Sequence, residues 1–157
     1  LDSTNFADCA SALYGYPHFV CDSGGSICEV VYSDDTDDPI LTALSGAMLL
    51  VWIKGSDAHT AELVRRFDRA PKPMYYQPAF MRAAWEGFLA ENRVSEANAD
   101  PDAFLRWTYA RALAHRQPRY AAIADRWGVT VTAEDVARVQ STGDFDRLIA
   151  SALEAKR

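Results

Sequence analysis

A glycine-rich segment that follows an acidic residue is the first candidate for chemistry in this chain of 157 residues. Residues 19–26 read FVCDSGGS, so an apolar run ends in an acid and continues as Ser-Gly-Gly-Ser. A carboxylate in this position could help to hold Mg²⁺, and the glycines would let backbone N–H groups approach an anion closely. The alternative is a plain turn that joins a strand to a loop. The residues concerned are Asp22, Ser23, Gly24, Gly25 and Ser26.

Three arginines form the second candidate. Arg65, Arg66 and Arg69 stand in the sequence RRFDRAPKP, directly before a segment stiffened by prolines. Guanidinium groups at the end of a helix could close over phosphates and neutralise the charge that develops during phosphoryl transfer. The alternative is a solvated helix face, in which Glu62 and Arg66 form an i,i+4 pair.

Other reactive residues give weaker patterns. His18, Cys21 and Cys28 match no common zinc spacing, and no fourth ligand is evident. Three cysteines without a CxxC motif favour a reducing compartment, so we expect a cytoplasmic location. A basic set further along the chain reads as a surface, although an anion site is the alternative: Arg111, His115, Arg116 and Arg119.

The elements that must position these residues alternate between helix and strand in the first half of the chain. We expect a helix over residues 2–14, a buried strand over 16–22, a short helix from Pro39, a second buried strand over 48–53 and a helix after Ser56. This order predicts a parallel sheet that contains both strands. Asp22 would then lie at the carboxyl end of a strand, where open α/β sheets bind ligands.

The second half is predicted to be almost entirely helical. Residues 70–78 contain three prolines and should be irregular, and Pro118 should interrupt a later helix. Residues 129–131 read as extended, with a capping box at Thr132 and Asp135. The fold class is therefore a helix-rich α/β protein: residues 1–76 form an α/β core with a partial parallel sheet, and residues 77–157 form a C-terminal helical bundle packed on it.

Charge and composition exclude several classes of protein. The net charge is −6, and residues 1–55 hold eight acidic side chains and one lysine, a local charge of −7. We therefore expect no nucleic-acid partner, because such binding needs a basic surface. No apolar run approaches the ~20 residues that span a bilayer, so we expect no membrane partner.

The combination of these segments resembles the second half of shikimate kinase-like P-loop kinases, over about residues 1–76. In that family a buried strand ends in a glycine-rich turn, and a later helix carries a lid arginine. The segment RRFDRAPKPMYY is also similar to uncharacterised bacterial P-loop ATPases. Two motifs depart from the kinase pattern. The family's Gly-Gly-Gly is Ser23-Gly24-Gly25-Ser26 here, which argues against shikimate as the acceptor, and its lid Arg-Pro is Ala70-Pro71.

The resemblance implies ATP and Mg²⁺ as cofactors of the intact protein. Asp22 would hold the metal, residues 22–26 would contact nucleotide or an unknown phosphate acceptor, and Arg65, Arg66 or Arg69 would close over the phosphates. The sequence has no G-x-x-x-x-G-K-S/T motif, and it starts at Leu1 instead of Met. We therefore expect the C-terminal portion of a nucleotide-dependent phosphotransferase or ATPase, inactive alone.

A second class of function stays open. The aromatic-rich residues 75–127 could instead form a non-catalytic helical module that binds another protein. A partial sheet should also expose an apolar edge, so a homodimer is compatible with the sequence.

Overall fold

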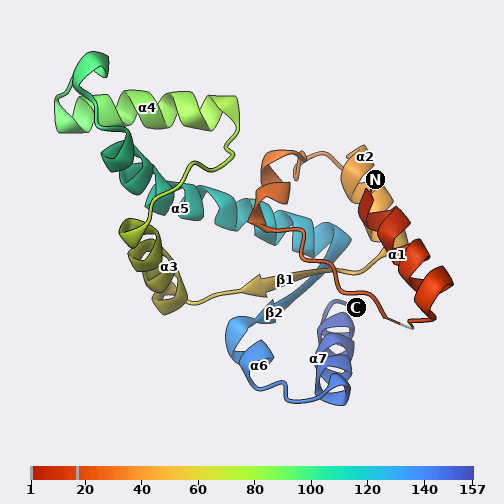
Figure 1. Ribbon diagram of the computed structural model, residues 1–157. Helices are drawn as coiled ribbons and strands as arrows, with labels where there is room; N and C mark the ends of the chain where they lie inside the picture. Colours follow the sequence, from red (N-terminus) through yellow and green to blue (C-terminus); the bar gives the residue numbers. More distant parts are fainter. Residues whose placement is uncertain (1, 17) are drawn as a thin grey trace.

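The computed structural model describes residues 2–16 and 18–157. Within these residues the fold is a helix-rich α/β arrangement with seven α-helices and a two-stranded parallel sheet (Figure 1). The helices are α1 (Asp2–Tyr14), α2 (Pro39–Ala47), α3 (Asp57–Arg69), α4 (Pro78–Asn92), α5 (Pro101–Trp127), α6 (Ala133–Ala137) and α7 (Thr142–Ala155). The strands are β1 (Leu50–Lys54) and β2 (Gly128–Thr132), and two short 3₁₀ helices are η1 (Gly25–Glu29) and η2 (Glu96–Asn98).

The two strands come from distant parts of the chain. They pair in parallel, with Leu50 opposite Gly128 and Lys54 opposite Thr132. Gly128 is required at its position, because a Cβ there would lie 2.2 Å from the backbone oxygen of Leu50. The part expected to be only a helical bundle therefore also supplies a strand, where the sequence predicted an extended segment.

The long helix α5 is the element on which most others pack. Its N-cap Asp100 accepts a hydrogen bond from the Asp102 N–H, and Pro101 opens its first turn. The predicted interruption at Pro118 is wrong, since α5 continues through this residue. Pro118 is exposed, and so is Ala114, whose carbonyl would have received the missing N–H, so water can satisfy that carbonyl.

Aromatic contacts hold α3 and α4 on α5. Phe67 of α3 stacks on Tyr109 with ring centroids 3.9 Å apart. In the α4–α5 pair, Phe88 is buried between Phe104 and Trp107 in edge-to-face geometry. The aromatic residues of the second half therefore pack largely against each other.

A buried cluster joins the first and second halves of the chain. Cys28, Val31 and Leu41 are fully buried and pack with Ile123 of α5. Asp38 fixes this region, because its carboxylate caps α2 through the Ile40 and Leu41 N–H groups and also accepts the Tyr32 N–H at 2.9 Å. Residues 1–76 and 77–157 thus share one core.

The predicted first strand is wrong. Residue 17 lies outside the described residues, and residues 16 and 18–22 have no regular structure and are exposed. The expected pairing of this segment with the second predicted strand is therefore also wrong, since β1 pairs with β2. An apolar segment forms a strand only where a neighbour satisfies its backbone, and β1 pairs elsewhere. The second predicted strand is confirmed over Leu50–Ile53, whereas Met48 ends α2.

In the part of the chain that the structure describes, no helix has both the length and the apolar character needed to cross a bilayer.

Candidate functional site

The glycine-rich loop 22–26 lies on the surface, and its conformation depends on Asp22 and Gly24. The Gly24 N–H donates to Asp22 Oδ1 at 2.8 Å, which closes a tight turn. Gly24 has a φ of 64°, in the left-handed region that favours glycine. All five residues from Asp22 to Ser26 are exposed, so the carboxylate and both hydroxyls face solvent.

Gly25 fixes the start of η1 to the helix α5. Its carbonyl accepts the Tyr120 hydroxyl at 2.7 Å and the Cys28 thiol at 3.3 Å. A Cβ at Gly25 would lie 2.6 Å from the Tyr120 hydroxyl oxygen, which leaves no space for a side chain. The second glycine of the loop is therefore required by a contact with α5, and Gly24 by its backbone conformation.

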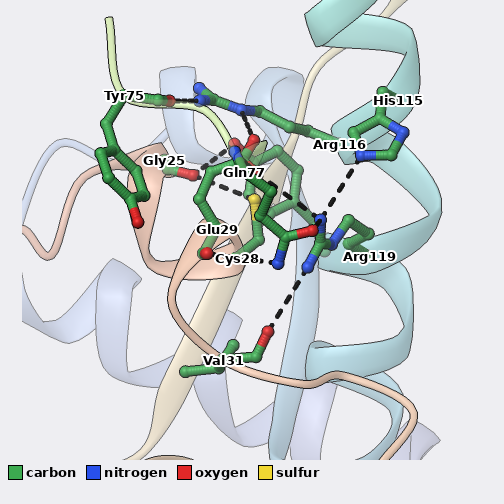
Figure 2. Close-up of polar contacts among 10 residues, drawn as sticks. Gly25, Cys28, Glu29, Val31, Tyr75, Gln77, His115, Arg116 and Arg119 are labelled. Carbon is green, nitrogen blue, oxygen red and sulfur yellow. Dashed lines mark hydrogen bonds and ion pairs between the residues drawn. The ribbon is translucent and has the colours of Figure 1, made fainter. Parts of the chain in front are cut away.

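Glu29, at the end of η1, forms a buried ion pair with Arg116 of α5 (Figure 2). Arg116 Nε donates to Glu29 Oε1 at 2.7 Å, and the two side chains are 4% and 0% exposed. The other carboxylate oxygen of Glu29 accepts the Gln77 N–H at 3.1 Å and lies 3.7 Å from Arg119 Nη1. Glu29 thus ties the loop to α5 and to the segment that precedes α4.

The arginines complete this network with neutral acceptors. Arg116 Nη2 donates to the Tyr75 carbonyl at 2.7 Å, and Arg119 donates to Gln77 Oε1 at 2.8 Å and to the Val31 carbonyl at 3.4 Å (Figure 2). These bonds replace the water that both guanidinium groups lose on burial. The network contains two cations and one carboxylate.

The surface interpretation of the basic set is wrong for Arg116, which is buried, and it fits Arg119 poorly, because that side chain is only 15% exposed. His115 is half-buried and stacks on Phe80. Arg111 is exposed as expected, and it pairs with Glu91 at 3.0 Å while lying over the Trp107 ring. A helix-period pattern cannot distinguish a surface arginine from one that meets a buried acid 87 residues away. Sequence reasoning also missed Glu29 itself.

Burial and hydrogen bonding set the protonation of this cluster. Burial opposes the charged form of Arg116, but the hydrogen bond with Glu29 and the electrostatic interactions with Tyr120, Glu29 and Cys28 together outweigh burial and raise the pKa of Arg116 above its ordinary value. Burial also raises the pKa of the Cys28 thiol and of the Tyr120 phenol. At neutral pH the thiol and the phenol are therefore hydrogen-bond donors, and the guanidinium keeps its charge.

The three candidate arginines lie away from the glycine-rich loop. All three are exposed, and Arg65 makes a two-pronged pair with Glu62 at 2.6 Å through both Nε and Nη2. The i,i+4 pair that the sequence suggested for Arg66 is thus replaced by an i,i+3 pair of Arg65. Phe67 and Gly25 contact α5 at Tyr109 and Tyr120, and eleven residues of helix correspond to about 16 Å along the axis. The structure does not bring the arginines and Asp22 together.

The proline-rich residues 70–77 connect these two regions along α5. Their last part is fixed, because Tyr76 is buried and the backbones of Tyr75 and Gln77 bond to Arg116 and Glu29. The residue before Arg69 is fixed as well, because the Asp68 carbonyl accepts a hydrogen bond from Arg106 Nε at 3.2 Å.

A further polar group lies at the carboxyl edge of the sheet. Ser56 caps α3, and its Oγ lies 2.8 Å from His59 Nδ1, while Glu134 Oε1 of α6 lies 3.6 Å from the same nitrogen. A catalytic triad needs the acid and the hydroxyl on opposite ring nitrogens. This group is therefore a helix cap, in which His59 Nδ1 also accepts the Ser56 N–H at 3.1 Å, with a glutamate beside it. Among the described residues, no three His, Cys, Asp or Glu side chains gather as a metal site.

Comparisons with protein-family models, with curated proteins and with solved structures found no match to this chain.

Proposed function

We propose that this chain is the C-terminal portion of a nucleotide-dependent phosphotransferase or ATPase of the P-loop kinase-like type. The observation that carries the proposal is the anchored loop 22–26. Its polar groups are exposed, whereas its base is held by Tyr120 and by the buried Glu29–Arg116 pair. Exposed polar loops on a rigid base are where binding groups concentrate, because the base fixes their geometry.

The loop fits the two cofactors in its chemistry. Asp22 and the serine hydroxyls offer the oxygen ligands that Mg²⁺ prefers, and Mg²⁺ in phosphoryl transfer takes only one or two carboxylates and completes its shell with phosphate and water. Asp22 would hold the metal, and the backbone of residues 23–26 would contact the nucleotide or the phosphate acceptor. Arg69 ends α3 and stands directly before the proline-rich residues 70–77, so it is the arginine that we assign to closure over phosphate.

The proposal requires a second component. A phosphate cradle of backbone N–H groups and its lysine are absent from this sequence. Another segment must supply them, so we expect no ATP turnover by this chain alone.

The test compares this chain with the complete product of the gene that encodes it. Mg²⁺-dependent release of phosphate from ATP should be found only where a G-x-x-x-x-G-K-S/T segment is present. Mg²⁺-dependent turnover by the purified chain alone would refute the inference that another segment supplies the phosphate cradle and its lysine. A complete product without that motif would favour the other class of function.

That other class is a non-catalytic interaction module. Its predicted surface, the aromatic residues 75–127, receives little support, because Phe88, Phe104 and Trp107 contact one another and leave few large apolar side chains exposed. The exposed apolar residues lie mostly in the first 53 residues. They include Phe6, Leu13, Tyr16, Phe19, Val20, Tyr32 and Ile53.

A further inference from the structure

A cavity of about 420 Å³ lies between the sheet and the C-terminal half of α5. It is lined by Trp52 of β1, Thr130 of β2, and Ala121, Ala122 and Asp125 of α5. Trp52 and Thr130 are opposite each other in the register of the two strands, so both side chains lie on the face of the sheet that α5 contacts. The volume falls in the range of small-molecule sites.

The lining offers one flat apolar surface to a ligand. The Trp52 indole is half-buried, and its ring centre lies 6.2 Å from that of Tyr120. Ala121 and Ala122 have only methyl side chains, so they leave room beside the indole for another flat ring. Every nucleobase can stack on an aromatic side chain, because each has a π face. The shape of the lining therefore favours a planar ligand.

Asp125 determines which planar ligands fit this cavity. Its side chain is exposed, and it has no ion-pair partner among the described residues. An ionised carboxylate accepts hydrogen bonds and donates none. The ligand group that meets Asp125 must therefore be a donor, such as an amino group on the ring. The Thr130 hydroxyl can donate or accept, so it does not discriminate between ligands.

Two ammonium groups near the cavity argue against an organic cation as the ligand. Lys54 Nζ lies 5.9 Å from the centre of the Trp52 ring. Lys156 Nζ donates to the carbonyls of Gly128 and of Ala124, the residue before Asp125. Both ammonium groups would repel a cation bound on Trp52. A neutral ring with an amino group avoids this repulsion, and Lys54 would attract a phosphate attached to such a ring.

We propose that this cavity binds an amino-substituted nucleobase, with its ring on Trp52 and its amino group donating to Asp125. The cavity and the loop 22–26 are connected through one residue of α5. Tyr120 contacts the Trp52 ring, and its hydroxyl donates to the Gly25 carbonyl at 2.7 Å. The inference rests on the proposed function for the choice of adenine as the base, and it adds the place where that base lies.

Adenosine tests this inference with the purified chain, without phosphate and without Mg²⁺. In amide NMR spectra we expect saturable shifts at Ala121, Ala122 and Thr130, with a dissociation constant below about 1 mM. Purine riboside is adenosine without the amino group, and it should bind about tenfold more weakly. Tetramethylammonium should not compete with adenosine, because the cavity does not favour a cation.

Three variants of the chain locate the binding. Asp125→Ala should lower the affinity for adenosine to that for purine riboside and leave the affinity for purine riboside unchanged. Trp52→Leu should weaken the binding of both nucleosides about tenfold, because stacking is lost. Asp146→Ala, at an exposed position of α7, is the matched control and should change neither affinity.

Four results would overturn the inference. They are the absence of adenosine binding, equal binding of adenosine and purine riboside, an affinity for adenosine that Asp125→Ala does not change, and displacement of adenosine by tetramethylammonium. The ATP turnover of the complete gene product tests the proposed function separately. Adenosine binding without turnover would count against the proposed function alone, and turnover without adenosine binding would count against this inference alone.

Discussion

Arg116 and Glu29 form a buried ion pair, with Nε and Oε1 2.7 Å apart, between residues that are 87 positions apart in the chain. The pair joins the 3₁₀ helix behind the glycine-rich loop to the centre of α5. Both charges are almost fully removed from water, so each depends on the other and on the neutral groups of Tyr75 and Gln77. The ion pair thus attaches the surface loop to the core of the protein.

Substitution of Glu29 by Gln should strongly destabilise the fold. The change leaves Arg116 and Arg119 buried without a carboxylate, and removing one partner of a buried pair costs about 3–5 kcal/mol. Urea unfolding followed by circular dichroism measures the loss. Glu91→Gln, at the exposed pair with Arg111, is the matched control and should cost less than about 1 kcal/mol. Similar losses for both variants would show that the buried pair does not hold the two halves together.

The two glycines of the loop should respond differently to alanine. Gly25→Ala places a Cβ against the Tyr120 hydroxyl, so Tyr120→Phe should recover part of the lost stability. Gly24→Ala meets no atom within 4 Å, and its cost arises from the positive φ, so Tyr120→Phe should not rescue it. Thermal unfolding of the single and double variants separates the two mechanisms. Equal rescue of both would contradict the assignment.

Because of Asp38, the free energy of unfolding should decrease at acidic pH. Burial alone would raise the pKa of this carboxyl, but hydrogen bonds from the N–H groups of Tyr32, Leu41 and Ile40 outweigh burial and lower the pKa below its ordinary value. Its contribution is therefore fully present above the unfolded pKa of about 3.9 and is lost as the pH falls through the lower folded pKa.

The variant Asp38→Asn isolates this contribution. At pH 7 it should lose about 1–2 kcal/mol of unfolding free energy, as expected for a helix cap. The difference in unfolding free energy between the wild type and Asp38→Asn should become smaller below pH 4. Urea unfolding across the pH range measures it. A difference that stays constant down to pH 2 would contradict the assignment.

Pro118→Ala should stabilise the protein. The substitution restores a backbone N–H inside α5 and removes the ring from an exposed position, which should add about 1–3 kcal/mol. Gln117→Ala, at the neighbouring position, should change the unfolding free energy by only a few tenths of a kcal/mol. A loss of stability in Pro118→Ala would mean that α5 requires the geometry that proline imposes.

Local signals in the sequence predicted much of the fold. Asp38-Pro39, Ser56 and Thr132 start helices where the sequence indicated, because capping depends on neighbouring residues only. The second strand and the extended residues 129–131 were also predicted, from an apolar run and from β-branched residues. Their pairing with each other was not predicted, because pairing depends on which segments the fold brings together.

Long-range contacts account for what the sequence could not predict. The apolar residues 18–22 have a strand-like sequence but no strand beside them. Arg116 stands in a basic stretch that reads as surface, and only the fold places it against Glu29. In the candidate site, the glycines and Asp22 were identified from their residue types, whereas the ion pair that fixes them required the structure.

The roles of Asp22 and the arginines form the central claim, and one measurement tests them most directly. It is the Mg²⁺-dependent ATP turnover of the complete gene product, compared with its Asp22→Asn and Arg69→Ala variants and with Arg93→Ala as an exposed control. We expect turnover in the wild type and the control. We expect the turnover rate to fall by about 10³-fold or more in Asp22→Asn and in Arg69→Ala, because the arginine would stabilise the transition state. Absence of turnover in the complete product, or variants within a few-fold of the wild type, would contradict the account.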